Sequence, residues 1–195
     1  MSKPSIILAS TSTTRKHQLN CLGIPFQAIA PTCDETPLIG EFAPDTALRL
    51  AKNKAYSLKA KHKNSIIIGA DQVALLNGQQ LGKPLTIDNA KIMLANMSEQ
   101  SIEFYSALCV LHSDFDHCQT HIDLTCVTMR TLTYQQIEHY LDKEPDAIYC
   151  AGAAKSEGLG AALIERIDSC DPNALLGLPI FKLVEFLNNE GIDII

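Results

Sequence analysis

The chain has 195 residues and a formal net charge of −6, but its charges are unevenly distributed. Residues 1–63 carry a balance of +5, whereas residues 64–195 carry a balance of −11. Non-specific binding of DNA or RNA requires a broad positive surface, so this distribution argues against a nucleic acid polymer as partner and favours a small anionic ligand bound locally. The length suits one large domain or two small lobes that share a core.

Composition excludes several other classes of protein. A hydrophobic content of 46% is ordinary for a folded protein and argues against disorder. The seven cysteines form no C-x-x-C pair, which argues against a disulfide framework and a zinc finger, and we expect a cytoplasmic protein because such scattered thiols suit a reducing compartment. The apolar run near the N-terminus is too short for a signal peptide, and no run approaches the roughly 18 residues that predict a membrane span.

The first half of the chain predicts strands that alternate with helices and end in a hairpin, since apolar runs rich in isoleucine are followed by helix-capping residues and glycine. In chain order, the expected elements are a strand at 5–9, a helix from Ser12 to Gly23, a strand at 24–30, a helix from Pro44 to about His62, a strand at 65–73 and a turn at Asn77-Gly78.

The second half adds a long antiparallel pair of strands to this alternation. The expected elements are a helix from Thr86 to near Met97, strands at 103–112 and 122–132, a helix at 133–143, short strands at 147–151 and 163–167, and a helix at 178–189. The whole pattern is typical of a mixed α/β architecture.

Polar residues at the first strand–helix junction predict a phosphate site. Ser10 and Ser12 place hydroxyls beside the free N–H groups of the helix start, and Arg15 can donate paired hydrogen bonds to phosphate oxygens. Taken alone, the same residues also fit an ordinary serine cap beside a solvated arginine.

Carboxylates at two predicted strand ends indicate a cation site. Asp34 and Glu35 lie in a proline-flanked loop after the second expected strand, and Asp71 ends the most apolar strand. Carboxylates at strand ends can hold a divalent cation, and a buried aspartate must be paired, metal-bound or protonated. The alternative for Asp34 and Glu35 is an ordinary solvent-exposed acidic turn, and the alternative for Asp71 is a solvent-exposed acid at the end of a strand.

Two lysines and one glutamate complete the candidates. Lys54 lies in the middle of the apolar stripe of its predicted helix, where it needs an anion partner unless its amine reaches solvent. Lys83 follows the hairpin, which returns the chain toward Asp71. Glu157 lies in the small-residue stretch 152–160, whose backbone can approach a flat ligand closely.

Seven short segments, in this order, resemble the Maf family of nucleotide pyrophosphatases, and the resemblance extends over nearly the whole chain. They are A-S-T-S-x-x-R at 9–15, D-E-T-P at 34–37, A-x-x-K-A at 51–55, G-A-D-Q-V at 69–73, G-K-P at 82–84, K-S-E-G at 155–158, and D-P-N followed by G-L-P at 171–179. Gln72 and the K-S-E-G segment further resemble the YceF-like subfamily, whose members hydrolyse 7-methyl-GTP.

This resemblance implies an α/β fold of the Maf/ITPase type, in which a mixed sheet and two lobes surround a deep central cleft. It implies a single domain over residues 1–195, often assembled as a homodimer. It also implies hydrolysis of a nucleoside triphosphate to a monophosphate and pyrophosphate with a divalent cation, Mg²⁺ or Mn²⁺. Arg15, Lys54 and Lys83 would then supply positive charge to the triphosphate and its leaving group.

The resemblance also assigns roles to individual residues. Asp71 matches the family's proton acceptor, and Glu35 matches the family motif better than Asp34 does, so Glu35 and Asp71 are the expected metal ligands. A carboxylate bound to a cation is a weak base, so Asp71 stays open as base or ligand. The positions that match the subfamily's specificity determinants are Thr14, Gln72 and Glu157.

Base recognition can be argued from hydrogen bonding. Guanine offers N1–H and N2–H₂ as adjacent donors, which the Glu157 carboxylate can accept together, and methylation at N7 adds positive charge that strengthens the pairing. Thr14 stands where relatives often have an aromatic residue that could stack on a cationic base. We therefore predict metal-assisted attack of water on the α-phosphate of 7-methyl-GTP. A broader pyrophosphatase and a nucleotide-binding regulator of cell division are the alternatives.

Overall fold

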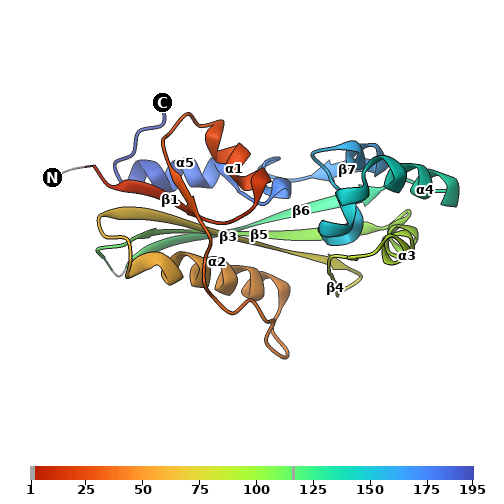
Figure 1. Ribbon diagram of the computed structural model, residues 1–195, viewed down its shortest axis with the longest axis horizontal. Coiled ribbons are helices and arrows are strands. Elements are labelled where there is room, and N and C mark those ends of the chain that lie inside the picture. The colour runs from red at the N-terminus through yellow and green to blue at the C-terminus, as the bar shows by residue number, and fades with distance from the viewer. Residues whose placement is uncertain (1–2, 116) are drawn as a thin grey trace. The chain divides into compact units, whose positions relative to one another are not determined.

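The structure is a computed structural model that describes residues 3–115 and 117–195, and it contains a seven-stranded mixed sheet (Figure 1). The strands are β1 (Ser5–Ala9), β2 (Gln27–Ile29), β3 (Ser65–Leu76), β4 (Gln79–Leu81), β5 (Ser101–His112), β6 (Cys118–Met129) and β7 (Ile164–Asp168). Their order is β2-β1-β3-β5-β6-β7, with β4 also paired to β3. β1 is parallel to β2 and β3, whereas the β3–β4 and β6–β7 pairs are antiparallel.

The described residues form five α-helices and four short 3₁₀ helices. They are α1 (Thr13–Asn20), α2 (Ala43–Lys59), α3 (Ile87–Met97), α4 (Tyr134–Lys143), α5 (Ile180–Asn189), η1 (Pro145–Tyr149), η2 (Ala151–Ala153), η3 (Leu159–Leu163) and η4 (Ala174–Leu176). Within the described ranges, no helix combines the length and the apolar character needed to cross a membrane. The mixed α/β class predicted from the sequence is confirmed.

The chain divides into two compact units. The first unit contains residues 1–72, 105–123 and 171–195, and the second contains residues 73–104 and 124–170. β3, β5 and β6 contribute residues to both units.

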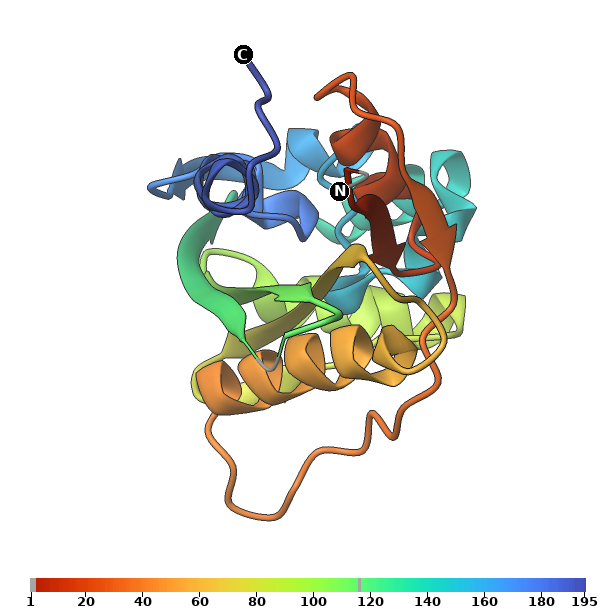
Figure 2. The ribbon, with the colours of Figure 1, turned by 90° about the vertical axis from the view of Figure 1, so that its left-hand side faces the viewer.

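In the first unit, helices cover both faces of the sheet, with α2 on one face and α1 and α5 on the other (Figures 1 and 2). The strand side chains alternate accordingly. Those of Ile6, Leu8, Ile66 and Ile68 pack with α5 residues such as Leu183 in one apolar cluster. Ile7 and Ile67, at the intervening positions, are also fully buried. Burial on both faces explains why these strands are continuous apolar runs rather than alternating ones.

In the second unit, α3 and α4 pack on each other and on the 3₁₀ helices η1 and η2. α3 buries Leu94 and Met97, while α4 buries Ile137, Tyr140 and Leu141. Both helices start as the sequence predicts, because threonine side chains cap them, and α4 has a complete capping box.

Several predicted boundaries are confirmed and one predicted strand is wrong. β1 matches residues 5–9, and the Asn77-Gly78 turn joins β3 to β4 with both residues at positive φ, as a two-residue hairpin of this kind requires. The strand expected at 147–151 is replaced by η1 and η2. Pro145 favours a helical start there, and Ala147 N and Cys150 N donate to carbonyls three residues earlier.

The remaining differences concern element ends. β2 keeps only three of the seven residues expected at 24–30, and β3 extends three residues past the expected end at 73. β6 begins at Cys118, earlier than the predicted 122, and residue 116 of the intervening segment lies outside the described residues. None of these shifts moves a candidate site residue from one element to another.

Candidate functional site

Two serines shape the chain between β1 and α1 in the first unit. Ser12 caps α1, since its side-chain oxygen accepts a hydrogen bond from Arg15 N at 3.3 Å. Ser10 is buried, and its Oγ accepts a hydrogen bond from Ser12 N at 3.1 Å. Each hydroxyl can still donate its own O–H to an anion at the helix start.

The guanidinium of Arg15 is fixed by two backbone carbonyls of the same unit. Nε donates to Gly177 O and Nη1 donates to Ala70 O, each at 2.9 Å. Burial lowers the pKa of Arg15 from its ordinary value, and the charges of Asp71 and Glu35 oppose that shift. Arginine has five N–H donors, so the two carbonyls orient the group and leave donors that can bind a phosphate.

Gly177 is part of this arrangement because of its backbone and its missing side chain. Its φ is 97°, in the left-handed region that favours glycine. A Cβ at this position would lie 3.0 Å from Arg15 Nε and 3.2 Å from Arg15 Nη2. The glycine therefore lets the 171–178 segment approach Arg15 closely enough to hold it.

Lys54 is paired with two carboxylates from different parts of the first unit. Its Nζ lies 2.6 Å from Asp71 Oδ1 and 2.8 Å from Glu35 Oε2. Lys54 and Asp71 are buried, with 7% and 8% of their surfaces exposed, whereas the Glu35 side chain is 55% exposed. The apolar-stripe lysine predicted on the α2 segment thus has its anion partners. We call Lys54, Asp71 and Glu35 the Lys54 cluster.

Gly69 allows the cluster to form by letting α2 lie directly on β3. A Cβ on residue 69 would lie 2.2 Å from Ala51 O and 2.9 Å from Ala55 N, far inside normal contact. Lys54 lies between these two alanines in sequence, and Asp71 is two residues beyond Gly69 on the same side of the strand. The close helix–strand approach therefore brings the ammonium and the carboxylate within hydrogen-bond distance.

Glu35, rather than Asp34, faces the cluster. The Asp34 carboxylate accepts a hydrogen bond from Thr36 N at 2.9 Å. Hydrogen bonding to the Thr36 side chain, and then to this backbone N–H, lowers the pKa of Asp34. Glu35 instead reaches Lys54. The neighbouring Cys33 thiol has a raised pKa because of its burial, and also because of the nearby Glu35 charge.

Among residues 3–115 and 117–195, no group of three or more His, Cys, Asp or Glu side chains is arranged to hold a metal ion. Glu35 and Asp71 are a pair, and their oxygens converge on a single cationic atom, Lys54 Nζ. Two carboxylates aimed at one positive charge can also contribute two ligands to a hydrated divalent cation, whose other ligands would be water or phosphate oxygens. The pair therefore fits the expected metal, although it does not form a complete site.

Gln72 and Thr14, two of the predicted specificity residues, also lie in the first unit. The Gln72 Nε2 group donates to Ser106 Oγ at 2.8 Å, to Leu175 O at 3.0 Å and to Ala174 O at 3.1 Å. Its amide N–H groups hold the 171–178 segment, so only its carbonyl oxygen is left to accept from a ligand. Thr14 is half-buried in the first turn of α1.

Lys83 and Glu157 lie in the second unit, and both are exposed. Both charges act on the pKa of one thiol: burial raises the pKa of Cys150 most and the Glu157 charge raises it further, while Lys155 and then Lys83 lower it. The segments that carry them are joined, since Gly152 N donates to Gly82 O at 3.2 Å. These two predicted residues are therefore close to a common neighbour within their own unit.

Residues of α4 brace the segment that carries Glu157. Tyr140 is buried, its hydroxyl donates to Ala153 O at 3.0 Å, and it accepts from Lys155 N at 3.0 Å. Glu144, at the end of α4, lies 3.1 Å from Lys155 Nζ, and this partner raises the pKa of Lys155. Sequence reasoning did not single out Tyr140 or Glu144, because their role depends on a loop that follows in the chain and has no periodic signal.

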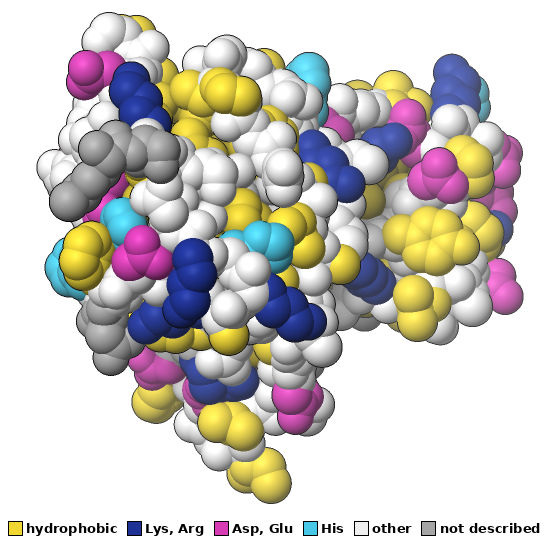
Figure 3. Space-filling view, turned by 60° about the vertical axis from the view of Figure 1, so that its left-hand side comes forward, with side chains coloured by type: hydrophobic (Ala, Val, Ile, Leu, Met, Phe, Trp, Pro, Cys, Tyr) yellow, Lys and Arg dark blue, Asp and Glu magenta, His cyan; other side chains and the backbone are white. Residues whose placement is uncertain are grey.

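Charge on the visible surface is mixed. Figure 3 shows Lys and Arg side chains separated by uncharged, acidic and hydrophobic ones rather than merged into one basic surface.

The family model described as Maf-like protein matches residues 5–190 of the chain. The chain is a member of the Maf family. The segments that resemble this family contain Arg15, the residues of the Lys54 cluster, Lys83 and Glu157.

Curated full-length relatives agree with this assignment. A Neisseria gonorrhoeae protein named 7-methyl-GTP pyrophosphatase is 54% identical over 97% of this chain and 97% of its own length. A Chromobacterium violaceum protein of the same name is 50% identical over 97% of this chain and 98% of its own. Among solved structures, the Ham1 protein of Staphylococcus aureus is similar with a TM-score of 0.44 and 15% identity, covering 64% of this chain and 71% of that one.

Proposed function

We propose that this Maf protein is a nucleotide pyrophosphatase that hydrolyses 7-methyl-GTP to 7-methyl-GMP and pyrophosphate. The observation that carries the chemistry is the buried contact of 2.6 Å between Lys54 and Asp71, with Arg15 fixed beside it through Ala70 O. Cations with a carboxylate among them suit hydrolysis of a triphosphate, whereas a pure anion sensor would keep acids away from its ligand. The names of the full-length relatives support the substrate.

The reaction requires attack by water on the α-phosphorus. A bond forms from the water oxygen to this phosphorus as the bond to the α,β-bridging oxygen breaks, and pyrophosphate leaves. Asp71 orients the water, and its role as proton acceptor is tested below against a role as metal ligand alone. Arg15, Lys54 and Lys83 stabilise the charge that develops on the phosphate oxygens, and Ser10 and Ser12 add hydroxyl donors.

A divalent cation, Mg²⁺ or Mn²⁺, would be held by Glu35 and Asp71. Bound there, it would neutralise phosphate charge and favour departure of pyrophosphate. The convergence of the two carboxylates on Lys54 Nζ supports this placement, since the same oxygens that surround an ammonium can surround a metal ion.

Recognition of the base is assigned to Glu157. Its carboxylate can accept hydrogen bonds from N1–H and N2–H₂ of guanine, and the positive charge of the N7-methylated ring strengthens both. The bracing of its segment by Tyr140 and Glu144 supports this assignment, because a recognition carboxylate must be held in place. Thr14 and the Gln72 carbonyl oxygen are the further specificity groups that we propose.

The test is a pyrophosphate-release assay with 7-methyl-GTP, GTP, dTTP and UTP, in the presence of Mg²⁺, of Mn²⁺ or of EDTA. We expect 7-methyl-GTP to have the highest kcat/KM and EDTA to abolish turnover. Equal values for GTP and 7-methyl-GTP would refute the methyl preference, and no release from any nucleotide with metal present would refute the enzyme assignment.

The role of Asp71 is tested separately with Asp71→Asn. We expect turnover to fall by at least about 10²-fold while nucleotide binding, measured by calorimetry, survives. Loss of binding together with turnover would instead assign Asp71 to construction of the phosphate and metal site.

A further inference from the structure

The segment that carries Glu35 is mostly exposed and has no regular secondary structure between β2 and α2. Figure 2 shows part of it projecting as a loop from the start of α2. An exposed loop of this kind explores many conformations unless other residues restrain it. The contact of 2.8 Å between Glu35 and Lys54 therefore requires a restraint on the loop backbone.

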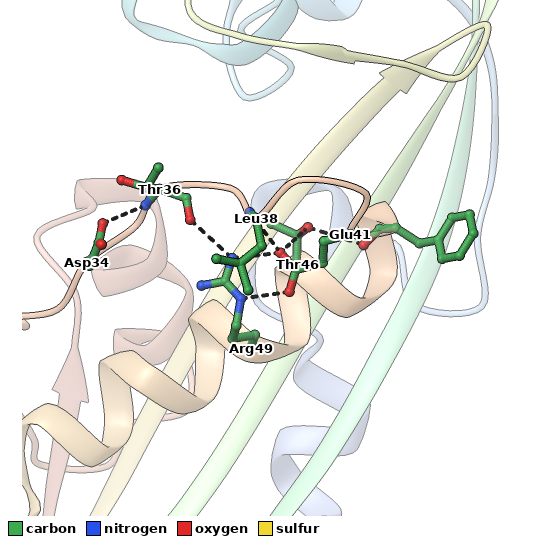
Figure 4. A network of polar contacts seen from close by, with 7 residues as sticks. Asp34, Thr36, Leu38, Glu41, Thr46 and Arg49 are labelled. Atoms are coloured by element: carbon green, nitrogen blue, oxygen red, sulfur yellow. Dashed lines mark hydrogen bonds and ion pairs between the residues drawn. The ribbon is translucent and has the colours of Figure 1, made fainter.

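Arg49 and Glu41 supply a fork-shaped contact in this loop (Figure 4). Arg49 Nε donates to Glu41 Oε1 and Arg49 Nη2 donates to Glu41 Oε2, each at 2.7 Å. Thr46 Oγ1 donates to the same carboxylate at 2.8 Å. These hydrogen bonds, chiefly from Arg49, lower the pKa of Glu41 to about 2. The paired geometry fixes direction as well as distance.

The same guanidinium also reaches the residue next to Glu35. Arg49 Nη2 donates to Thr36 O at 3.2 Å. On the other side of Glu35, Thr32 N donates to Ser57 Oγ at 3.3 Å. α2 therefore holds the loop backbone at two points, with Lys54 between Arg49 and Ser57 along the helix.

The geometry points to Arg49 and Glu41 as positioning residues that hold Glu35 against Lys54 and Asp71, and so set the cation site of the proposed pyrophosphatase. Neither side chain belongs to the Lys54 cluster. Glu41 orients the guanidinium, and the guanidinium in turn fixes Thr36 O and the carboxylate one residue before it. We name Arg49, Glu41 and Thr36 the loop clamp.

The test uses Arg49→Lys, which keeps the charge but removes the fork, and Glu41→Gln, which keeps the size but removes the charge. The matched control is Arg166→Lys, since Arg166 also donates through Nε and Nη2 to one carboxylate, that of Asp168, on the exposed strand β7. The wild type, these three variants and the double variant of Arg49→Lys with Glu41→Gln are all compared well below their melting temperatures so that each is folded.

Three measurements separate a positioning role from a merely structural one. Mn²⁺ affinity is measured by electron paramagnetic resonance without nucleotide, the alkylation rate of Cys33 by mass spectrometry, and kcat and KM by pyrophosphate release. In both clamp variants we expect weaker Mn²⁺ binding, Cys33 alkylation faster by about fivefold or more, and kcat lower by roughly 10- to 100-fold with a smaller change in KM. The double variant should lose no more than the worse single one, because both residues act through one contact.

The inference is overturned if Arg49→Lys and Glu41→Gln lower only the melting temperature and leave Mn²⁺ affinity, Cys33 alkylation and kcat at wild-type values. It is also overturned if Arg166→Lys produces the same changes. The kcat measurement depends on the proposed function, whereas the other two do not. A wild-type protein without activity but with a clamp-dependent Cys33 rate and Mn²⁺ affinity would refute the function and retain the positioning role.

Discussion

Gly69→Ala is the substitution that most directly challenges the packing beneath the site. The new Cβ would lie 2.2 Å from Ala51 O and 2.9 Å from Ala55 N, where ordinary contact begins at 3.4 Å. Both atoms belong to the helix backbone and cannot rotate away, so α2 must retreat from β3 by about 1 Å. Overpacking of this kind costs about 1–3 kcal/mol, offset by roughly 0.5 kcal/mol because alanine restricts the unfolded chain.

The retreat also lengthens the contact of 2.6 Å between Lys54 and Asp71, because Lys54 moves with the helix. We expect a net loss of about 0.5–2.5 kcal/mol in urea unfolding and a fall in kcat of roughly 10²-fold in pyrophosphate release. Gly82→Ala is the control for stability, since residue 82 has no heavy atom within 4 Å of an added Cβ. Wild-type stability and kcat in Gly69→Ala would refute the close helix–strand contact as the support of the cluster.

Three further substitutions test other parts of the site. Gly177→Ala places a residue with a Cβ at φ 97°, in the left-handed backbone region, and sets that Cβ against Arg15 Nε. We therefore expect a loss of about 1–2 kcal/mol in the free energy of urea unfolding and a raised KM. An unchanged KM would show that Arg15 does not bind the substrate. Glu157→Gln should lower the kcat/KM ratio of 7-methyl-GTP over UTP by about tenfold or more, and an unchanged ratio in the nucleotide panel would remove Glu157 from base recognition. The pKa of the Glu41 carboxylate falls from 4.5 to about 2, so its contribution to stability is complete above pH 4.5 and is lost as the pH falls through about 2. The difference in unfolding free energy between wild type and Glu41→Gln should therefore be constant from pH 5 to 7 and shrink toward pH 2. A difference that does not depend on pH would contradict the pairing of Glu41 with Arg49.

Local signals were sufficient to predict most of the fold. β1 is an unbroken apolar run, α3 and α4 begin at threonine caps, and the β3–β4 turn is an Asn-Gly pair, so each is specified by a few adjacent residues. The 147–151 segment was predicted wrongly because its short apolar run fits a strand and a helical turn equally well. Pro145 and the hydrogen bonds from backbone N–H groups to carbonyls three residues earlier stabilise the helical turn η1 instead.

Part of the Lys54 cluster was predictable, because one of its residues departs from its local pattern. Lys54 stands out because it interrupts an apolar helical stripe, and the structure supplies the two carboxylates that it needs. The loop clamp was not predictable in this way. Arg49 and Glu41 are eight residues apart, on the helix and on the loop before it, and an arginine and a glutamate at such positions resemble ordinary solvated charges.

Gln72 shows a different limit of sequence reasoning. The resemblance to the Maf family assigns it to substrate specificity, and its amide nitrogen donates to Ser106 Oγ and to two carbonyls of the 171–178 segment. Those acceptors are far away in sequence, so no local pattern reports them. Any effect of Gln72 on specificity must then pass through its carbonyl oxygen or through the segment that it holds.

Hydrolysis of 7-methyl-GTP in ¹⁸O-labelled water, followed by mass spectrometry of the products, tests the proposed reaction most directly. Attack at the α-phosphorus predicts 7-methyl-GMP that carries one ¹⁸O atom and pyrophosphate that carries none. Label in the pyrophosphate, release of 7-methyl-GDP and inorganic phosphate, or no turnover with Mg²⁺ or Mn²⁺ present would contradict the proposed reaction.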